Sequence, residues 1–264
     1  MSCVEEIIKA VVLGIVQGFT EFLPISSSGH LLLFRKMFGL AEAGLLLDTM
    51  LHVGTLVAVV AVFWRDILEM IKRPFSHLTL LVIMGTIPTG IIGLAFKDTF
   101  EHLATTGVFL GWSFLATGLI LWLADSLKER GLKEISDVSF KNAFLVGTLQ
   151  GVAIIPGVSR SGLTISGSLF QGIEKETAAR FSFLLSLPAI MGAALVQSVD
   201  LFKGNIEGIG MGALLIGTLV AAVCGYIAVR WMLEIIKNKS LKIFSYYLWI
   251  VGAGVLFTQL MGWF

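Results

Sequence analysis

Three residues in one short segment have the types and spacing for acid–base and nucleophilic chemistry: Glu21, Ser27 and His30. Glu21 is a carboxylate inside an apolar run, where an ionisable group is costly and is by default a functional candidate. Ser27 and His30 are three residues apart, which places them close together on one face of a helix. A serine beside a histidine is the minimum arrangement for an activated nucleophile. The segment predicts attack by Ser27 or by water, with His30 as the general base.

The same segment also has the features of an anion-binding helix start. Ser26, Ser27 and Ser28 follow Pro24 and precede a new apolar helix that begins near Gly29. Serines at such a position cap the helix, and the free backbone amides there bind anions. Two simpler alternatives remain at this stage. In the first, the three serines act only as helix caps. In the second, the Glu21 carboxylate only extends to the membrane surface and has no role in chemistry.

A second segment carries one basic residue, Arg160, deep inside another apolar stretch. A guanidinium buried without an anion is expensive, whereas an arginine among hydroxyls and glycine amides makes a bidentate phosphate clamp. The alternative is that Arg160 only pairs with Glu21 and holds the two segments together. The polar neighbours that accompany Arg160 are Ser159, Ser161, Gly162 and Thr164.

The elements that must position these residues are two long apolar stretches, 7–33 and 143–170, each interrupted by Pro, Gly and Ser. Interrupted backbone at membrane depth persists only where it is buried in protein or lines a wet cavity. The two stretches are copies of each other. A shift of 133 residues superimposes six identities without a gap, carrying Gly14, Gln17, Gly18, Ser26, Ser28 and Gly29 onto Gly147, Gln150, Gly151, Ser159, Ser161 and Gly162. We therefore predict two repeats, 1–133 and 134–264, that together form one membrane domain.

The composition places the rest of the chain in a membrane. Of 264 residues, 56% are hydrophobic and only 14% are charged, and the net charge is +1. These values exclude a disordered chain, a secreted soluble domain and a basic nucleic-acid-binding face. Six stretches are long and apolar enough to span a bilayer. They are 45–64, 78–96, 106–124, 181–199, 209–229 and 243–263.

If each interrupted stretch returns to the side of the membrane from which it entered, each repeat crosses the bilayer three times. Because three is odd, the second repeat then starts on the opposite side of the membrane from the first. The sequence thus predicts an all-α polytopic membrane protein: an inverted tandem repeat with six transmembrane helices and two re-entrant helical hairpins that meet at the midplane. Loops 65–77, 125–142, 171–180 and 230–242 hold thirteen Lys and Arg residues, against five on the other side. The positive-inside rule makes these loops cytoplasmic and places both termini outside.

The two segments resemble the signature motifs of the undecaprenyl-diphosphate phosphatase family, the bacitracin-resistance membrane phosphatases. The first reads Gln17-Gly-Phe-Thr-Glu-Phe-Leu-Pro-Ile-Ser-Ser-Ser-Gly-His30, and the second reads Pro156-Gly-Val-Ser-Arg-Ser-Gly-Leu-Thr164. The resemblance covers essentially the whole chain. It implies hydrolysis of a C55 polyprenyl diphosphate to the monophosphate at the outer face of the cytoplasmic membrane, with a divalent cation. Gln17 stands where members of this family often carry a second acid.

This chemistry gives each candidate a role. Glu21, Ser27, His30 and Arg160 are the predicted catalytic residues, and Glu21 is also the predicted ligand of Mg²⁺ or Ca²⁺, which prefer carboxylate oxygens. The predicted substrate-binding residues are Gln17, Ser26, Ser28, Gly29, Ser159, Ser161, Gly162 and Thr164.

The expected partners are the polyprenyl diphosphate and the surrounding membrane lipids, with a second copy of the chain as a candidate and no nucleic acid. The alternative function is a transporter or flippase of a lipid phosphate or small anion, since interrupted helices in inverted repeats also build transporters. A carrier needs an anion clamp but no nucleophile–base pair, so Ser27 and His30 favour the enzyme. His52 lies inside a span near Asp48, where it either pairs with that carboxylate at i, i+4 or faces the site.

Overall fold

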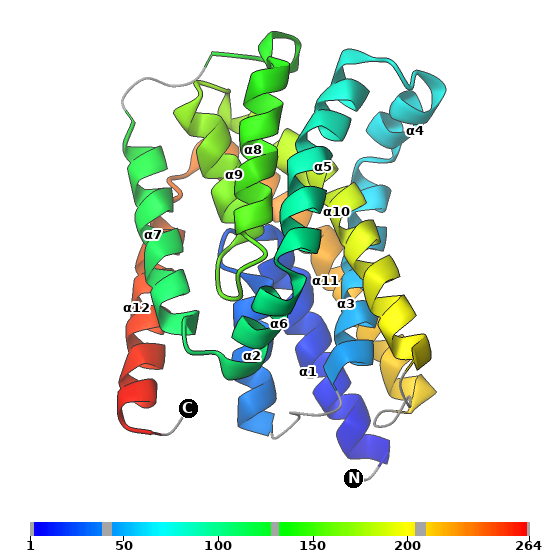
Figure 1. Cartoon of the computed structure of the whole chain (residues 1–264), viewed down its shortest axis with the longest axis vertical. Helices are drawn as coiled ribbons and strands as arrows, with labels where there is room; N and C mark the ends of the chain where they lie inside the picture. Colours follow the sequence, from blue (N-terminus) through cyan, green and yellow to red (C-terminus); the bar gives the residue numbers. More distant parts are fainter. Residues whose placement is uncertain (1–2, 39–43, 128–131, 204–209, 263–264) are drawn as a thin grey trace.

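The computed structural model describes residues 3–38, 44–127, 132–203 and 210–262. Within these ranges the chain forms twelve α-helices and one short 3₁₀ helix, Ile135–Asp137 (η1), with one isolated bridge between Lys133 and Ile173 and no named strand (Figure 1). The helices run mostly along the long axis of the molecule. The predicted all-α polytopic architecture is confirmed.

The two interrupted stretches are helical hairpins. The first consists of α1 (Cys3–Phe22) and α2 (Ser27–Phe38), and the second of α8 (Phe140–Val152) and α9 (Arg160–Phe170). At the first break Ser26 takes the left-handed conformation, with φ of 72°. At the second break Gly157 does so, with φ of 86°, where a non-glycine residue would be strained. The predicted interruptions are therefore confirmed.

The hairpins approach each other from opposite ends of the molecule. In Figure 1 α1 rises from the lower end and α2 returns there, whereas α8 descends from the upper end and α9 returns upward. Their tips touch: Ser161 Oγ donates to the carbonyl of Leu23 at 3.1 Å, and the amide of Gly157 donates to Ser28 Oγ at 3.4 Å. Both termini lie at the lower end of Figure 1. The inverted repeat and its boundary at residue 133 stay predictions from the sequence shift.

Each predicted span contains one long helix. These helices are α3 (Gly44–Val62), α5 (His77–Ala95), α7 (Leu110–Ser126), α10 (Lys175–Lys203), α11 (Met211–Asn238) and α12 (Lys242–Leu260). In the described chain, four helices are long and apolar enough to span a membrane alone, and up to six are if each bent pair is one span. Residues 128–131, inside one predicted cytoplasmic loop, lie outside the described residues.

Two short helices were not predicted. Helix α3 ends at Val62 and the chain bends by 80° into α4 (Trp64–Lys72). Helix α6 (Lys97–Thr106) precedes a bend of 108° into α7. The predicted stretches 45–64 and 106–124 therefore each include part of a bend. Neither α4 nor α6 has a fully buried residue, although Ile67 and Met70 of α4 are partly buried against the core.

Close helix packing joins the two halves of the chain. Helix α1 packs on α11, α5 on α8, and α7 on α12. The contact of α5 with α8 depends on glycine, because a Cβ added at Gly147 would lie 2.0 Å from the carbonyl oxygen of Gly85. Small residues at such contacts let helices approach closely, as in membrane bundles. This packing fixes α8 of the second hairpin against α5, a span of the first half of the chain.

Candidate active site

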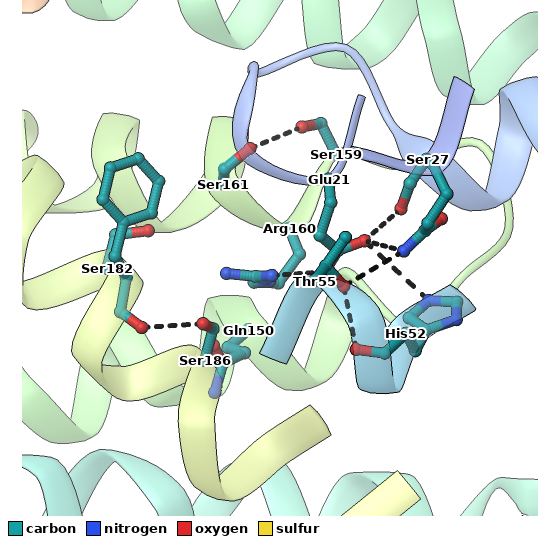
Figure 2. A network of polar contacts seen from close by, with 12 residues as sticks. Glu21, Ser27, His52, Thr55, Gln150, Ser159, Arg160, Ser161, Ser182 and Ser186 are labelled. Carbon is teal, nitrogen blue, oxygen red and sulfur yellow. Dashed lines mark hydrogen bonds and ion pairs between the residues drawn. The ribbon is translucent and has the colours of Figure 1, made fainter. Parts of the chain in front are cut away.

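An ion pair joins the two hairpin tips. Glu21 lies in the last turn of α1, and Arg160 is the first residue of α9. Arg160 Nη2 donates to Glu21 Oε1 at 2.5 Å (Figure 2), and the two side chains are only 15% and 6% exposed. Two residues separated by 139 positions thus meet because each hairpin brings its tip to the same place. The ion pair between Arg160 and Glu21, which the sequence offered as an alternative to phosphate binding, is therefore present.

The second carboxylate oxygen of Glu21, Oε2, lies near three more side chains. Ser27 Oγ donates to Oε2 at 2.5 Å and Gln17 Nε2 donates to it at 3.1 Å, while His52 Nε2 lies 3.8 Å away. We call Glu21 with Gln17, Ser27, His52 and Arg160 the Glu21 cluster. Figure 2 shows Glu21, Ser27, His52 and Arg160 converging from three segments of the chain: the first hairpin, α3 and the start of α9. In this cluster the Ser27 hydroxyl and the Arg160 guanidinium each contact the Glu21 carboxylate, one at each oxygen.

The predicted Ser27–His30 pair is not formed. His30 Nδ1 lies 2.7 Å from the carbonyl oxygen of Ser26, and Nε2 lies 2.8 Å from the hydroxyl of Tyr247. The imidazole also stacks on the Tyr247 ring, with 5.7 Å between centroids, and contacts Phe114. Both ring nitrogens are therefore occupied by groups other than Ser27. The prediction that Ser27 pairs with His30, made from their three-residue spacing, is therefore wrong. Ser27 donates to Glu21 instead.

The serines that flank the cluster support the hairpin tips. Ser26 Oγ accepts from the amide of Gly29 at 3.3 Å, and Ser159 Oγ accepts from the amide of Gly162 at 3.1 Å. These are N-cap hydrogen bonds, so the capping alternative describes Ser26, and Ser159 makes the equivalent bond in the second tip. The predicted binding residues Gly29 and Gly162 thus have their amides satisfied within their own tips.

The remaining predicted binding residues make contacts between elements. Ser28 and Ser161 join the two tips, as described above. Thr164 Oγ1 lies 2.6 Å from Ser182 Oγ and also donates to the Arg160 carbonyl at 2.8 Å. Of the eight predicted binding residues, Gln17 is the one whose side chain contacts Glu21 directly.

His52 is the residue whose place the sequence left open. Its Nδ1 lies 2.8 Å from the backbone carbonyl of Asp48, one turn earlier in α3, which leaves Nε2 directed at Glu21. The alternative in which His52 faces the site is therefore the one observed. The carboxylate of Asp48 forms an ion pair with Arg35 of α2, a contact that spacing in the sequence did not predict.

The donors of the Glu21 cluster fit a hard cation. Gln17 Oε1 is buried without a hydrogen-bond partner beside the Glu21 carboxylate, and Ser27 and Thr55 supply further oxygens nearby. Magnesium and calcium prefer such oxygen ligands and take several from substrate phosphates. The described ranges hold no group of three or more His, Cys, Asp or Glu side chains suited to a metal. Protein ligation here would rest on Glu21 and Gln17.

Comparison with known proteins identifies the family. The family model described as "Bacitracin resistance protein BacA" matches residues 10–254. The chain belongs to the BacA family. An undecaprenyl-diphosphatase 4 of Bacillus cereus (strain ZK / E33L) is 53% identical over 252 residues, which are 96% of this chain and 97% of that protein. Undecaprenyl-diphosphatases of Carboxydothermus hydrogenoformans and Halothermothrix orenii are 50% and 45% identical, over 97% and 95% of this chain and 98% and 97% of theirs.

The family match begins at residue 10, inside α1, and covers the tips of both hairpins of this BacA-family chain. The match begins before Gln17 and ends after α9, so it includes every residue of the Glu21 cluster. The family resemblance drawn from the two motifs is confirmed.

Proposed function

We propose that this BacA-family protein hydrolyses undecaprenyl diphosphate to undecaprenyl monophosphate and inorganic phosphate, and so recycles a lipid carrier of cell-wall synthesis. The full-length relatives named undecaprenyl-diphosphatase support this substrate. The observation that carries the chemistry is the Ser27 hydroxyl at 2.5 Å from a carboxylate whose other oxygen holds Arg160. Nucleophile, proton acceptor and phosphate clamp are then adjacent.

Arg160 would bind the phosphate that is transferred. Its Nη1 is buried without a hydrogen-bond partner, and its Nη2 is held by Glu21. A phosphate offers two oxygens to the planar guanidinium fork, which a lysine cannot match. The carboxylate of Glu21 thus stands where a phosphate oxygen would bind, and substrate would take over the guanidinium and release Glu21 Oε1.

Ser27 would attack the terminal phosphorus, and Glu21 would accept its proton. The Oγ–P bond forms while the bond from phosphorus to the bridging oxygen breaks, and undecaprenyl monophosphate leaves. Water then attacks the phosphoserine, the Oγ–P bond breaks, and Glu21 returns its proton to Oγ, which releases inorganic phosphate and regenerates the hydroxyl. Phosphoryl transfer of this kind depends mainly on positioning and charge neutralisation. In a second route water attacks directly and Ser27 only binds the phosphate.

His30 takes a positioning role in this proposal. Its ring nitrogens contact the Ser26 carbonyl and the Tyr247 hydroxyl, so it holds the left-handed turn that directs Ser27 toward Glu21. A divalent cation, Mg²⁺ or Ca²⁺, would be held by Glu21 and the Gln17 amide oxygen and would neutralise phosphate charge.

We also propose that the protein lies in the cytoplasmic membrane with its active site and both termini toward the outer face. The thirteen-to-five excess of Lys and Arg supports this orientation. Two single-cysteine variants test it, each in a background in which Cys3 and Cys224 are replaced by Ser. A thiol reagent that cannot cross membranes is expected to label Met261→Cys and not Lys239→Cys on intact cells. The reverse pattern contradicts the orientation.

The test of the activity is release of phosphate from undecaprenyl diphosphate by the purified protein in detergent, with and without a chelator. We expect release that the chelator abolishes and that added Mg²⁺ or Ca²⁺ restores. Transport of intact lipid phosphate between leaflets of reconstituted vesicles, without any phosphate release in detergent, would favour the flippase alternative instead.

A further inference from the structure

A second arginine–carboxylate pair lies beside the Glu21 cluster. Arg35 of α2 forms an ion pair with Asp48 of α3, and each side chain is 19% exposed. Arg35 Nε and Asp48 Oδ1 are both buried and have no hydrogen-bond partner. A buried ion pair with unsatisfied atoms is poor evidence of stabilisation, because desolvation offsets the attraction. The pair is therefore better suited to exchanging partners than to holding α2 and α3 together.

The position of this pair suits a ligand that extends out of the Glu21 cluster. Asp48 is one helical turn from His52, whose ring faces Glu21. Arg35 lies eight residues after Ser27 in α2, a rise of about 12 Å, and a helical side chain leans back toward the helix start. Arg35 is thus linked to the Glu21 carboxylate through Asp48, which it contacts, and His52, which contacts both Asp48 and Glu21.

We propose that Arg35 is a second phosphate-binding residue, which exchanges Asp48 for the phosphate that stays on the lipid. This inference rests on the proposed function and adds to it the basis for choosing a diphosphate. One guanidinium cannot neutralise two phosphates, and each arginine of this site is held in the empty state by a carboxylate that a phosphate oxygen can replace. Arg35 lies in the last turn of α2, away from the hairpin tip, so the phosphate that is not attacked would lead from the tip toward the lipid tail.

The test compares the KM and kcat of Arg35→Gln, Asp48→Asn and the double variant for farnesyl or undecaprenyl diphosphate. We expect Arg35→Gln and the double variant to raise KM at least about tenfold, about 1.4 kcal/mol of binding, and to change kcat much less. Asp48→Asn, which removes the competing carboxylate, should lower KM or leave it unchanged. The control is Lys36→Gln, which removes a positive charge from the same turn of α2 and should leave KM nearly unchanged.

A structural role predicts a different pattern. If the pair only joins α2 to α3, Arg35→Gln and Asp48→Asn should reduce activity and melting temperature alike, and the double variant should recover toward the wild type. That result would overturn the proposal. So would a KM for the double variant within about twofold of the wild type.

A binding measurement separates this inference from the proposed function. Inorganic pyrophosphate and orthophosphate are titrated into the detergent-solubilised full chain, without any turnover. We expect the wild type to bind pyrophosphate more tightly than orthophosphate, and the double variant to lose most of that preference. If wild-type protein fails to hydrolyse the lipid but shows this preference, the proposed function fails and the second phosphate site stands. Equal preference in wild type and double variant refutes the role of Arg35, whatever the activity.

Discussion

Replacing Ser27 by Ala separates the two routes of phosphoryl transfer. The hydroxyl donates to Glu21 Oε2 at 2.5 Å and has no contact with His30, so its removal leaves the turn held by His30 in place. If Ser27 is the nucleophile, the variant loses the attacking atom itself. If water attacks, the variant loses only one hydrogen bond to a charged group. The sizes of these two losses differ enough to be told apart.

The expected magnitudes follow from that one contact. A hydrogen bond to a charged group is worth about 1.5–3 kcal/mol, which corresponds to a loss of about 10- to 150-fold in rate. Loss of a nucleophile costs far more, about 10⁶-fold in a serine protease. We therefore expect Ser27→Ala to reduce single-turnover phosphate release by more than about 10³-fold.

The control is Ser28→Ala, whose hydroxyl makes only the tip contacts with Ser26 and the Gly157 amide, at 3.4 Å each. We expect it to lose about tenfold or less, since these are neutral hydrogen bonds. Equal, mild losses in both variants with an intact fold would refute Ser27 as the nucleophile and leave water as the attacking group.

Three further variants test single parts of the account. Arg160→Lys keeps the charge but loses the planar fork, so we expect at least about a tenfold loss of turnover, about 1.4 kcal/mol, and near-normal kinetics would contradict the clamp. Tyr247→Phe leaves His30 Nε2 without its partner and should cost about 1–3 kcal/mol of unfolding free energy, so an unchanged denaturation midpoint would argue against the anchoring role. Gly147→Ala should destabilise by about 1–3 kcal/mol or more in the same assay, whereas Gly192→Ala, with nothing within 4 Å of its new Cβ, should not; equal behaviour would refute the packing argument.

Much of the fold could be predicted because its signals are local. Hydropathy located the six long helices, although α10 begins earlier than the stretch 181–199 and α11 continues past the stretch 209–229 to Asn238. Pro, Gly and Ser located both hairpin breaks. The short helices α4 and α6 were missed because their residues continue the composition of the loops beside the spans. A bend of 80° or 108° between two helices leaves no periodic signal in the sequence.

The site was predicted in part, and the errors share one cause. Glu21 and Arg160 were recognised as buried charges, and the repeat placed them at facing tips. The contact of His30 with Tyr247 joins residues 217 positions apart, so helical spacing around Ser27 could not reveal it. Arg35 and Asp48 meet across two helices for the same reason. Spacing along the sequence predicts which side chains are neighbours on one helix. Whether two such neighbours form a hydrogen bond also depends on the partners that other helices offer them.

The central claim is that the Glu21 cluster, assembled where the two hairpin tips meet, cleaves a lipid diphosphate. The most direct measurement is the lipid product formed from undecaprenyl diphosphate by purified wild-type protein and by Arg160→Ala at matched folded concentration. We predict undecaprenyl monophosphate and one equivalent of phosphate from the wild type, and almost none from the variant. Near-normal turnover in Arg160→Ala would contradict the claim and reduce the Arg160–Glu21 contact to a structural ion pair.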